Sequence, residues 1–248
     1  MTDTVAHEPA TAASKGLLAR FVGVLTSPRQ TYADIAQRPT WLGMFLLVVV
    51  ISSACGGWLA STTIGRRAAV DEASRMTESL GIKMPEASYD RMRDQMMNAS
   101  DWRMYLQATL ASLVFVALGC LVVAGILFGV FNAVLGGDAR FKQVFAIVVF
   151  SQAVVVTKTI FTTPLNYARE SLSNPTTFAA LAPMLDDSSL VAKILGSIDF
   201  FWLWWIASLS IGLGVLYKRP TRGIATALIG VYVVLAVTIA VVLALIRG

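Results

Sequence analysis

The residues of this sequence that could do chemistry are a few polar side chains set in long apolar stretches. Gln152 lies within one uncharged run, Lys158 ends that run, and Asp199 begins a later one. Such side chains are costly in hydrocarbon, so they mark either a translocation path or hydrogen bonds between helices. If the two runs are neighbouring helices, Lys158 and Asp199 can form an ion pair. We take Gln152, Lys158 and Asp199 as the candidate intramembrane polar site and favour helix packing over a path.

The sequence lacks the residue patterns of common catalytic, metal and nucleotide-binding sites. The only histidine, His7, is remote from the apolar runs, so no Ser–His or Cys–His pair can be built on it. Both cysteines, Cys55 and Cys120, lie inside apolar runs without metal-ligand spacing. Phosphate-binding and dinucleotide-binding motifs are also missing from the sequence. The sequence predicts that the protein is not an enzyme and uses no cofactor and no metal.

The composition is that of a membrane protein. The chain is 56% hydrophobic and only 14% charged, whereas soluble domains carry about 25% charged residues. The mean hydropathy is +0.68, and the net charge of +5 comes from Lys and Arg that flank apolar runs. This pattern predicts the lipid bilayer as partner, not nucleic acid. A membrane-protein partner or a homo-oligomer also remains open.

Five uncharged runs define the elements that must position the polar residues. A helix needs about 20 apolar residues to cross a bilayer. The predicted spans are 41–63, 107–131, 142–162, 199–217 and 224–246. The third is short and requires Lys158 to reach the interface with its long stem. The fold class is therefore all-α: a polytopic integral membrane protein whose five-helix transmembrane bundle occupies residues 39–248.

Residues 15–38 predict a pair of amphipathic helices before the first span. In the first, Arg20 points away from an apolar face. That face comprises Leu17, Leu18, Phe21, Val22 and Leu25. The second, at 28–37, has Ser27 as N-cap and Gln30 completing a capping box. Two interpretations stay open: the pair lies on the membrane surface, or it packs as a cap on the bundle.

Three polar segments lie outside these elements. Residues 1–14 predict a disordered tail. The extramembrane loop 64–105 predicts a helical hairpin divided near Gly81. Residues 163–198 form a second sizeable loop, which is interrupted by Pro164, Asn174-Pro175 and Pro183.

Small residues four positions apart predict close helix packing. Gly125 and Gly129 form such a pair in the second span, and Ser208 and Gly212 form one in the fourth. These four are the candidate helix-packing residues.

The orientation follows from the short loops. Both 132–142 and 218–223 are basic, and Lys and Arg in short loops mark the cytoplasmic side. We therefore predict a multi-pass protein with a cytoplasmic N-terminus.

Two segments together carry a family resemblance. Residues 27–39 start with Ser27-Pro28-Arg29 and precede the first span, and residues 136–145 lead from the second span into the third. With five spans and a large first loop, residues 20–246 resemble the bacterial branch of the Yip1-domain family. The resemblance implies five spans, a cytoplasmic N-terminus and location in the bacterial plasma (inner) membrane. Eukaryotic members bind Rab GTPases, but this chain lacks their Asp-Leu-Tyr-Gly-Pro signature, so Rab binding is not implied.

The function predicted from these features is that of a non-enzymatic membrane scaffold or adaptor that organises membrane or binds partners. The alternative is a small permease or lipid-moving protein with a polar path near spans 3 and 4, lined by Gln152, Thr157, Lys158 and Asp199.

Overall fold

Helices form wherever the sequence carries long apolar runs. The computed structural model describes residues 16–82, 84–181, 184 and 189–247. Within these residues the only extended pairing is an isolated antiparallel bridge between Thr177 and Asp199. The tail predicted at 1–14 lies outside the described residues.

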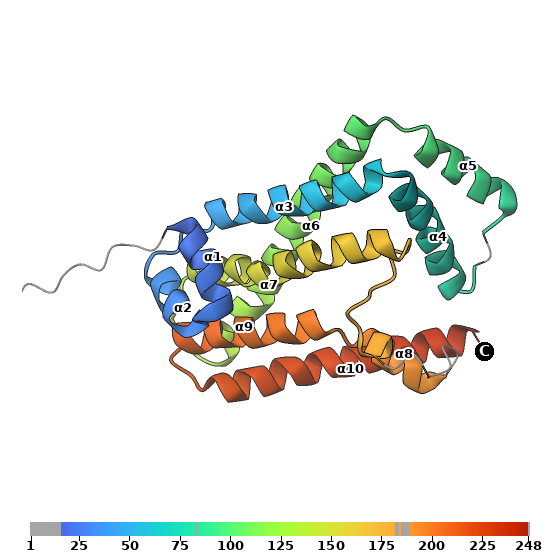
Figure 1. Cartoon of the computed structure of the whole chain (residues 1–248). Coiled ribbons are helices and arrows are strands. Elements are labelled where there is room, and N and C mark those ends of the chain that lie inside the picture. The colour runs from blue at the N-terminus through green and yellow to red at the C-terminus, as the bar shows by residue number, and fades with distance from the viewer. Residues whose placement is uncertain (1–15, 83, 182–183, 185–188, 248) are drawn as a thin grey trace, which may run out of the picture.

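Long helices run alternately from one end of the molecule to the other (Figure 1). They are α3 (Leu42–Ser61), α6 (Asp101–Phe128), α7 (Phe141–Ala168), α9 (Phe200–Leu216) and α10 (Thr221–Arg247). A π-helical turn, η1 (Gly129–Val134), extends α6.

Four segments are long and apolar enough to cross a membrane. They are Leu42–Ser61, Asp101–Val134, Phe141–Ala168 and Thr221–Ile239. The fifth predicted span corresponds to α9, an apolar helix of 17 residues. At about 1.5 Å per residue it measures roughly 26 Å, somewhat less than the roughly 30 Å hydrocarbon core.

Helix α7 is the centre of the bundle. It packs against α1, α2, α3, α6 and α9, and its side chains from Val144 to Phe150 are buried. The loop predicted to start at residue 163 begins later, because α7 continues through Pro164 to Ala168. A proline removes one N–H and crowds the preceding turn, but here only one turn follows it. The third run is thus a helix of 28 residues.

Two short helices, α1 (Leu17–Thr26) and α2 (Pro28–Gln37), cover one end of the bundle (Figure 1). Both pack on α7, and α2 also packs on α9. Ser27 is the N-cap of α2, but its side chain makes no capping hydrogen bond, so the predicted capping box is not formed. Instead the Ser27 carbonyl accepts from the Thr31 hydroxyl at 3.1 Å.

The predicted face of α1 needs correction. Arg20, Gly23 and Val24 are the buried residues of this helix, whereas Leu18 and Val22 are 67% and 52% exposed. The packed face is therefore the one that carries the charge. Of the apolar residues of α1, Phe21 and Leu25 pack partly against the core, whereas Leu18 and Val22 face outward. Arg20 can be buried because Asp34 and Thr40 supply polar partners for it.

Helices α4 (Thr63–Ser79) and α5 (Glu86–Met97) pack on one another at the opposite end (Figure 1). The Arg66 side chain joins them to α6: it donates to Met97 O at 3.0 Å and Ala99 O at 2.8 Å and pairs with Asp101 at 2.6 Å. Tyr89 donates to Asp71 Oδ1 at 2.9 Å. This hydrogen bond to the carboxylate raises the pKa of Tyr89.

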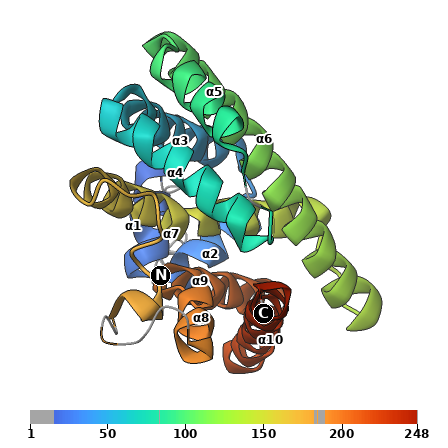
Figure 2. The same ribbon diagram turned by 90° about the vertical axis from the view of Figure 1, so that its right-hand side faces the viewer.

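Helix α6 is largely exposed on the outside of the bundle. It runs along α3 and leans outward in the view along the bundle (Figure 2). Large apolar side chains such as Phe115 (76% exposed) and Ile126 (61% exposed) face outward. The 3-10 turn η2 (Phe178–Leu181) and α8 (Leu190–Ser197) lie beside the start of α9. Ile198 has an extended backbone conformation, so α8 and α9 are two separate helices.

Candidate functional site

Asp199 begins α9 and is 3% exposed. Its Oδ1 atom accepts from the backbone N–H groups of Phe201 at 2.7 Å and Trp202 at 3.1 Å. These are two of the first N–H groups of a helix, which have no partner within it, and a carboxylate is favoured there by the helix dipole. Asp199 is therefore an N-cap as well as a buried charge.

The second carboxylate oxygen gathers three donors. Lys158 Nζ of α7 lies 2.7 Å from Asp199 Oδ2, so the ion pair that the sequence allows is formed. Asn174 Nδ2 and Thr176 Oγ1 each lie 2.6 Å from the same oxygen. Both oxygens of Asp199 are thus engaged, which is what a buried carboxylate requires. This set is called the Asp199 cluster below.

Backbone contacts hold the Asp199 cluster together. Phe200 N donates to Thr176 O at 3.1 Å and Phe178 N donates to Ile198 O at 3.0 Å, so the segment before η2 lies against the start of α9. The Tyr232 hydroxyl of α10 accepts from Asp199 N at 3.1 Å. Sequence reasoning missed Asn174, Thr176 and Tyr232. Asn174 and Thr176 lie in a loop without a helical period, and only the fold brings Tyr232 near.

Gln152 lies outside the Asp199 cluster. Its side chain interacts with the Cys120 thiol of α6. Six residues separate it from Lys158, which is about 600° of helix rotation, so the two side chains leave α7 on different sides. Ala153, Val154 and Val156, which lie between them, are fully buried. The structure therefore joins Lys158 to Asp199 and leaves Gln152 apart.

A second buried charge occupies the opposite end of the bundle. Arg20 is 5% exposed; its Nε atom lies 2.8 Å from Asp34 Oδ2 and its Nη1 atom 2.7 Å from Thr40 Oγ1. The guanidinium also lies over the Phe150 ring of α7, 5.9 Å from its centre. Arg20 thus joins α1 to α2 through Asp34, and through Thr40 to the segment that precedes α3. The sequence signal was present, a single Arg on an amphipathic helix, but it indicated an exposed side.

The two segments that carry the family resemblance meet at this end. Gln143 Nε2, at the start of α7, donates to Ala36 O of α2 at 2.9 Å. Tyr32 of α2 is fully buried, and its hydroxyl lies 2.8 Å from Ser208 Oγ of α9. A Cβ added to Gly212 would lie 2.6 Å from Ile147 Cγ2 and 3.1 Å from Tyr32 Cδ1. Ser208 and Gly212 are therefore where α2 and α7 approach α9.

Gly125 and Gly129 are placed differently. A Cβ at either position would meet nothing within 4 Å. Neither glycine serves a close helix approach to another described residue, because α6 turns this face outward.

Among the described residues, no group of three or more His, Cys, Asp or Glu side chains could hold a metal ion. The chemistry of the two buried clusters is that of charge neutralisation and hydrogen bonding between elements.

Comparison with known proteins agrees with the resemblance in the sequence. Comparisons with curated proteins and with solved structures found no match. The profile of the Yip1 domain matches residues 22–245. The match includes both segments that carry the resemblance, the Asp199 cluster, and the long helices apart from the last two residues of α10. The chain belongs to the Yip1 domain family.

Proposed function

We propose that this membrane protein of the Yip1 type is a non-enzymatic scaffold or adaptor. The observation that carries the proposal is the end formed by α1 and α2, called the platform below (residues 17–37). Tyr32 and the Ala36 carbonyl fix it to α9 and α7 through buried or half-buried hydrogen bonds, and the Arg20–Asp34 ion pair joins its two helices. Its outer side keeps an apolar stripe at Leu18 and Val22. A fixed apolar surface of this kind suits docking to a partner or a membrane surface.

The interior of the bundle also supports a scaffold. Along α7, buried apolar side chains separate the platform from the Asp199 cluster. In the cluster, both carboxylate oxygens already have partners. A static ion pair with complete ligation suits a structural role better than a path for ions.

The topology that fits this proposal has five crossings, with the platform on the cytoplasmic side of a bacterial inner membrane. The basic loops 132–142 and 218–223 lie at the platform end, and four helices meet the length for a span. In this arrangement α9 crosses with Asp199 at one interface and Tyr217 at the other, while α4 and α5 form an extramembrane hairpin on the far side.

In-membrane cross-linking tests the scaffold. Photo-reactive residues placed at Leu18 and Val22 should yield a discrete cross-linked partner in native membranes, and Leu18→Ser/Val22→Ser should abolish co-purification of that partner. Leu80→Ser/Ile82→Ser is the matched control, because these apolar side chains are equally exposed at the opposite end. Equal loss in both variants, or no cross-link from the platform, contradicts the proposal.

A second candidate function, a small permease or lipid-moving protein, is favoured by one observation: Lys158 and Asp199 form an ion pair between α7 and α9 with little exposure of either side chain. Purified protein in liposomes distinguishes the two. The scaffold predicts no ion flux and no lipid scrambling. Flux that Asp199→Asn or Gln152→Leu abolishes would establish the second candidate instead.

A further inference from the structure

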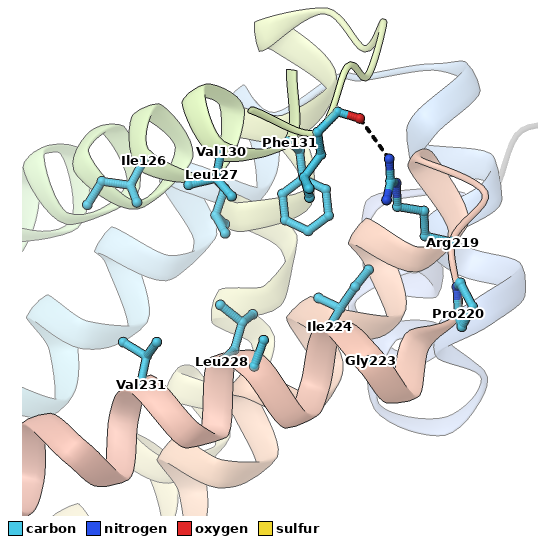
Figure 3. A pocket seen from close by; sticks show the side chains of 12 residues that line it. Ile126, Leu127, Val130, Phe131, Arg219, Pro220, Gly223, Ile224, Leu228 and Val231 are labelled. Carbon is cyan, nitrogen blue, oxygen red and sulfur yellow. Dashed lines mark hydrogen bonds between the residues drawn. The ribbon is translucent and has the colours of Figure 1, made fainter. Parts of the chain in front are cut away.

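A cleft opens on the outer surface of the bundle between α6 and α10. Its volume is about 460 Å³, within the range of roughly 300–1,000 Å³ found for ligand sites. Leu127 and Val130 form one wall and Leu228 and Val231 the other (Figure 3). Arg219 is the only lining residue that is not apolar.

The length of the cleft matches one leaflet of a bilayer. From Gly223 to Val231 it follows α10 along nine residues, whose eight intervals span about 12 Å at 1.5 Å each. Half of a hydrocarbon core is about 15 Å. An acyl chain entering from the platform side would therefore lie along the cleft without reaching the other leaflet.

Positive charge gathers where the cleft ends. Arg219 lies at this end beside Pro220 (Figure 3). Its Nη2 atom donates to Leu135 O at 2.7 Å, which leaves the other N–H groups of the guanidinium available. Lys218 and Arg222 flank it and are exposed. In the described part of the chain, none of these three cations forms an ion pair with a carboxylate.

The mouth of the cleft is held in place by its own contacts. Tyr217 donates to Asn132 Oδ1 at 2.6 Å, and its ring stacks on Phe131 with centres 4.7 Å apart. Lys218 adopts the left-handed conformation, with φ of 53°, and Arg219 N donates to Gly214 O at 3.0 Å. The turn that carries the cations is therefore fixed relative to η1 and the cleft walls.

We infer that the cleft binds an anionic phospholipid of the surrounding bilayer. One acyl chain lies between α6 and α10, and the phosphate group is bound by Arg219, Lys218 and Arg222. Basic pockets between transmembrane helices on the cytoplasmic side are typical sites for anionic headgroups. The charge at the mouth selects against a zwitterionic lipid, whose headgroup carries no net negative charge. This site is separate from the platform, so its failure would leave the proposed scaffold untouched.

Native mass spectrometry of the full chain tests the headgroup site. Protein in detergent is offered equal amounts of phosphatidylglycerol and phosphatidylcholine, and the retained lipid is measured. We expect phosphatidylglycerol to be preferred, and Arg219→Gln and Arg222→Gln each to lower its retention about fivefold, since one cation near the surface contributes about that factor. Arg29→Gln is the control, because Arg29 is an exposed cation at the same end, on α2.

A second variant tests the acyl-chain site. Ala227 lines the cleft, so Ala227→Phe should fill it and lower retention of either lipid by at least as much. Leu235→Phe is the control, because Leu235 is exposed on α10 outside the cleft. Equal retention of the two lipids, equal loss in Arg29→Gln, or a protein dimer that Ala227→Phe dissociates would each overturn the inference. The last result would make the cleft a contact between copies.

Discussion

At the level of single residues, the buried charges Arg20 and Asp199 set the chemistry of the helix bundle. Each lies at one end of the bundle and each has several partners from different elements. A charge in a medium of low dielectric constant persists only when it is paired and hydrogen-bonded. The partners are therefore as much part of each site as the charge itself.

Asp199 should matter more for stability than Lys158. Asp199→Asn places an NH₂ group among donors and removes the charge, so we expect a loss of about 3–5 kcal/mol in the free energy of unfolding. Lys158→Met removes one of five partners and should cost less. Unfolding in mixed detergent–SDS micelles measures both.

The matched control for this comparison is Arg75→Gln. Arg75 pairs with Glu72 at 3.6 Å, and both side chains are largely exposed, so the change should cost about 0–1 kcal/mol. If Lys158→Met is as costly as Asp199→Asn, the importance of the capping and loop partners of Asp199 is refuted.

At the level of elements, the contact of α2 with α9 and α7 depends on small residues. Tyr32 fits against Gly212 and bonds to Ser208, and this contact brings the platform onto the bundle. Gly125 and Gly129 have the same spacing on α6 but face outward. Identical spacing thus has different consequences, because only one of the two helices is enclosed.

Alanine substitution separates the two glycine pairs. Gly212→Ala should cost about 1–3 kcal/mol, because its Cβ would lie 2.6 Å from Ile147 Cγ2 and overpacking must push the neighbours apart. Gly125→Ala meets open space and should be neutral or stabilising by up to about 1 kcal/mol, since Ala is the better helix former. Thermal unfolding of the monodisperse protein measures both. A large loss for Gly125→Ala would show that another copy covers α6.

For the whole molecule, the arrangement of the long helices fixes where the chain ends emerge. Alternating helices place α1 at one end and the last turn of α10 at the other (Figure 1). This result depends on α9, whose 17 residues are the fewest among these helices.

A reporter fused after Gly248 tests this topology. If all five helices cross, an alkaline phosphatase fusion at the C-terminus should be active and a green fluorescent protein fusion dark, while a fluorescent fusion at the N-terminus should be bright. Fusions within the 218–223 loop should behave like the N-terminal one. C-terminal and N-terminal reporters on the same side would show that one helix, most simply α9, does not cross.

By itself, the sequence determined the helical membrane class and most element positions. The uncharged runs require helices because a bilayer offers no partner for free backbone groups. The second short helix falls at Pro28–Gln37 as predicted, since Pro28 favours its start and Pro39 its end. The family was also recognisable, because its two segments are local in sequence.

Only the tertiary structure decided which faces meet. Periodicity groups apolar residues on a helix but cannot say whether that group faces protein or lipid, since both are apolar; this is why α1 buries Arg20 and exposes Leu18. In the same way, Asn174, Thr176 and Tyr232 join Asp199 through contacts 23 to 33 residues apart in the chain. The sequence around Asn174, Thr176 and Tyr232 gives no sign of this role. A buried charge must have hydrogen-bond partners, and which residues provide them depends on the fold.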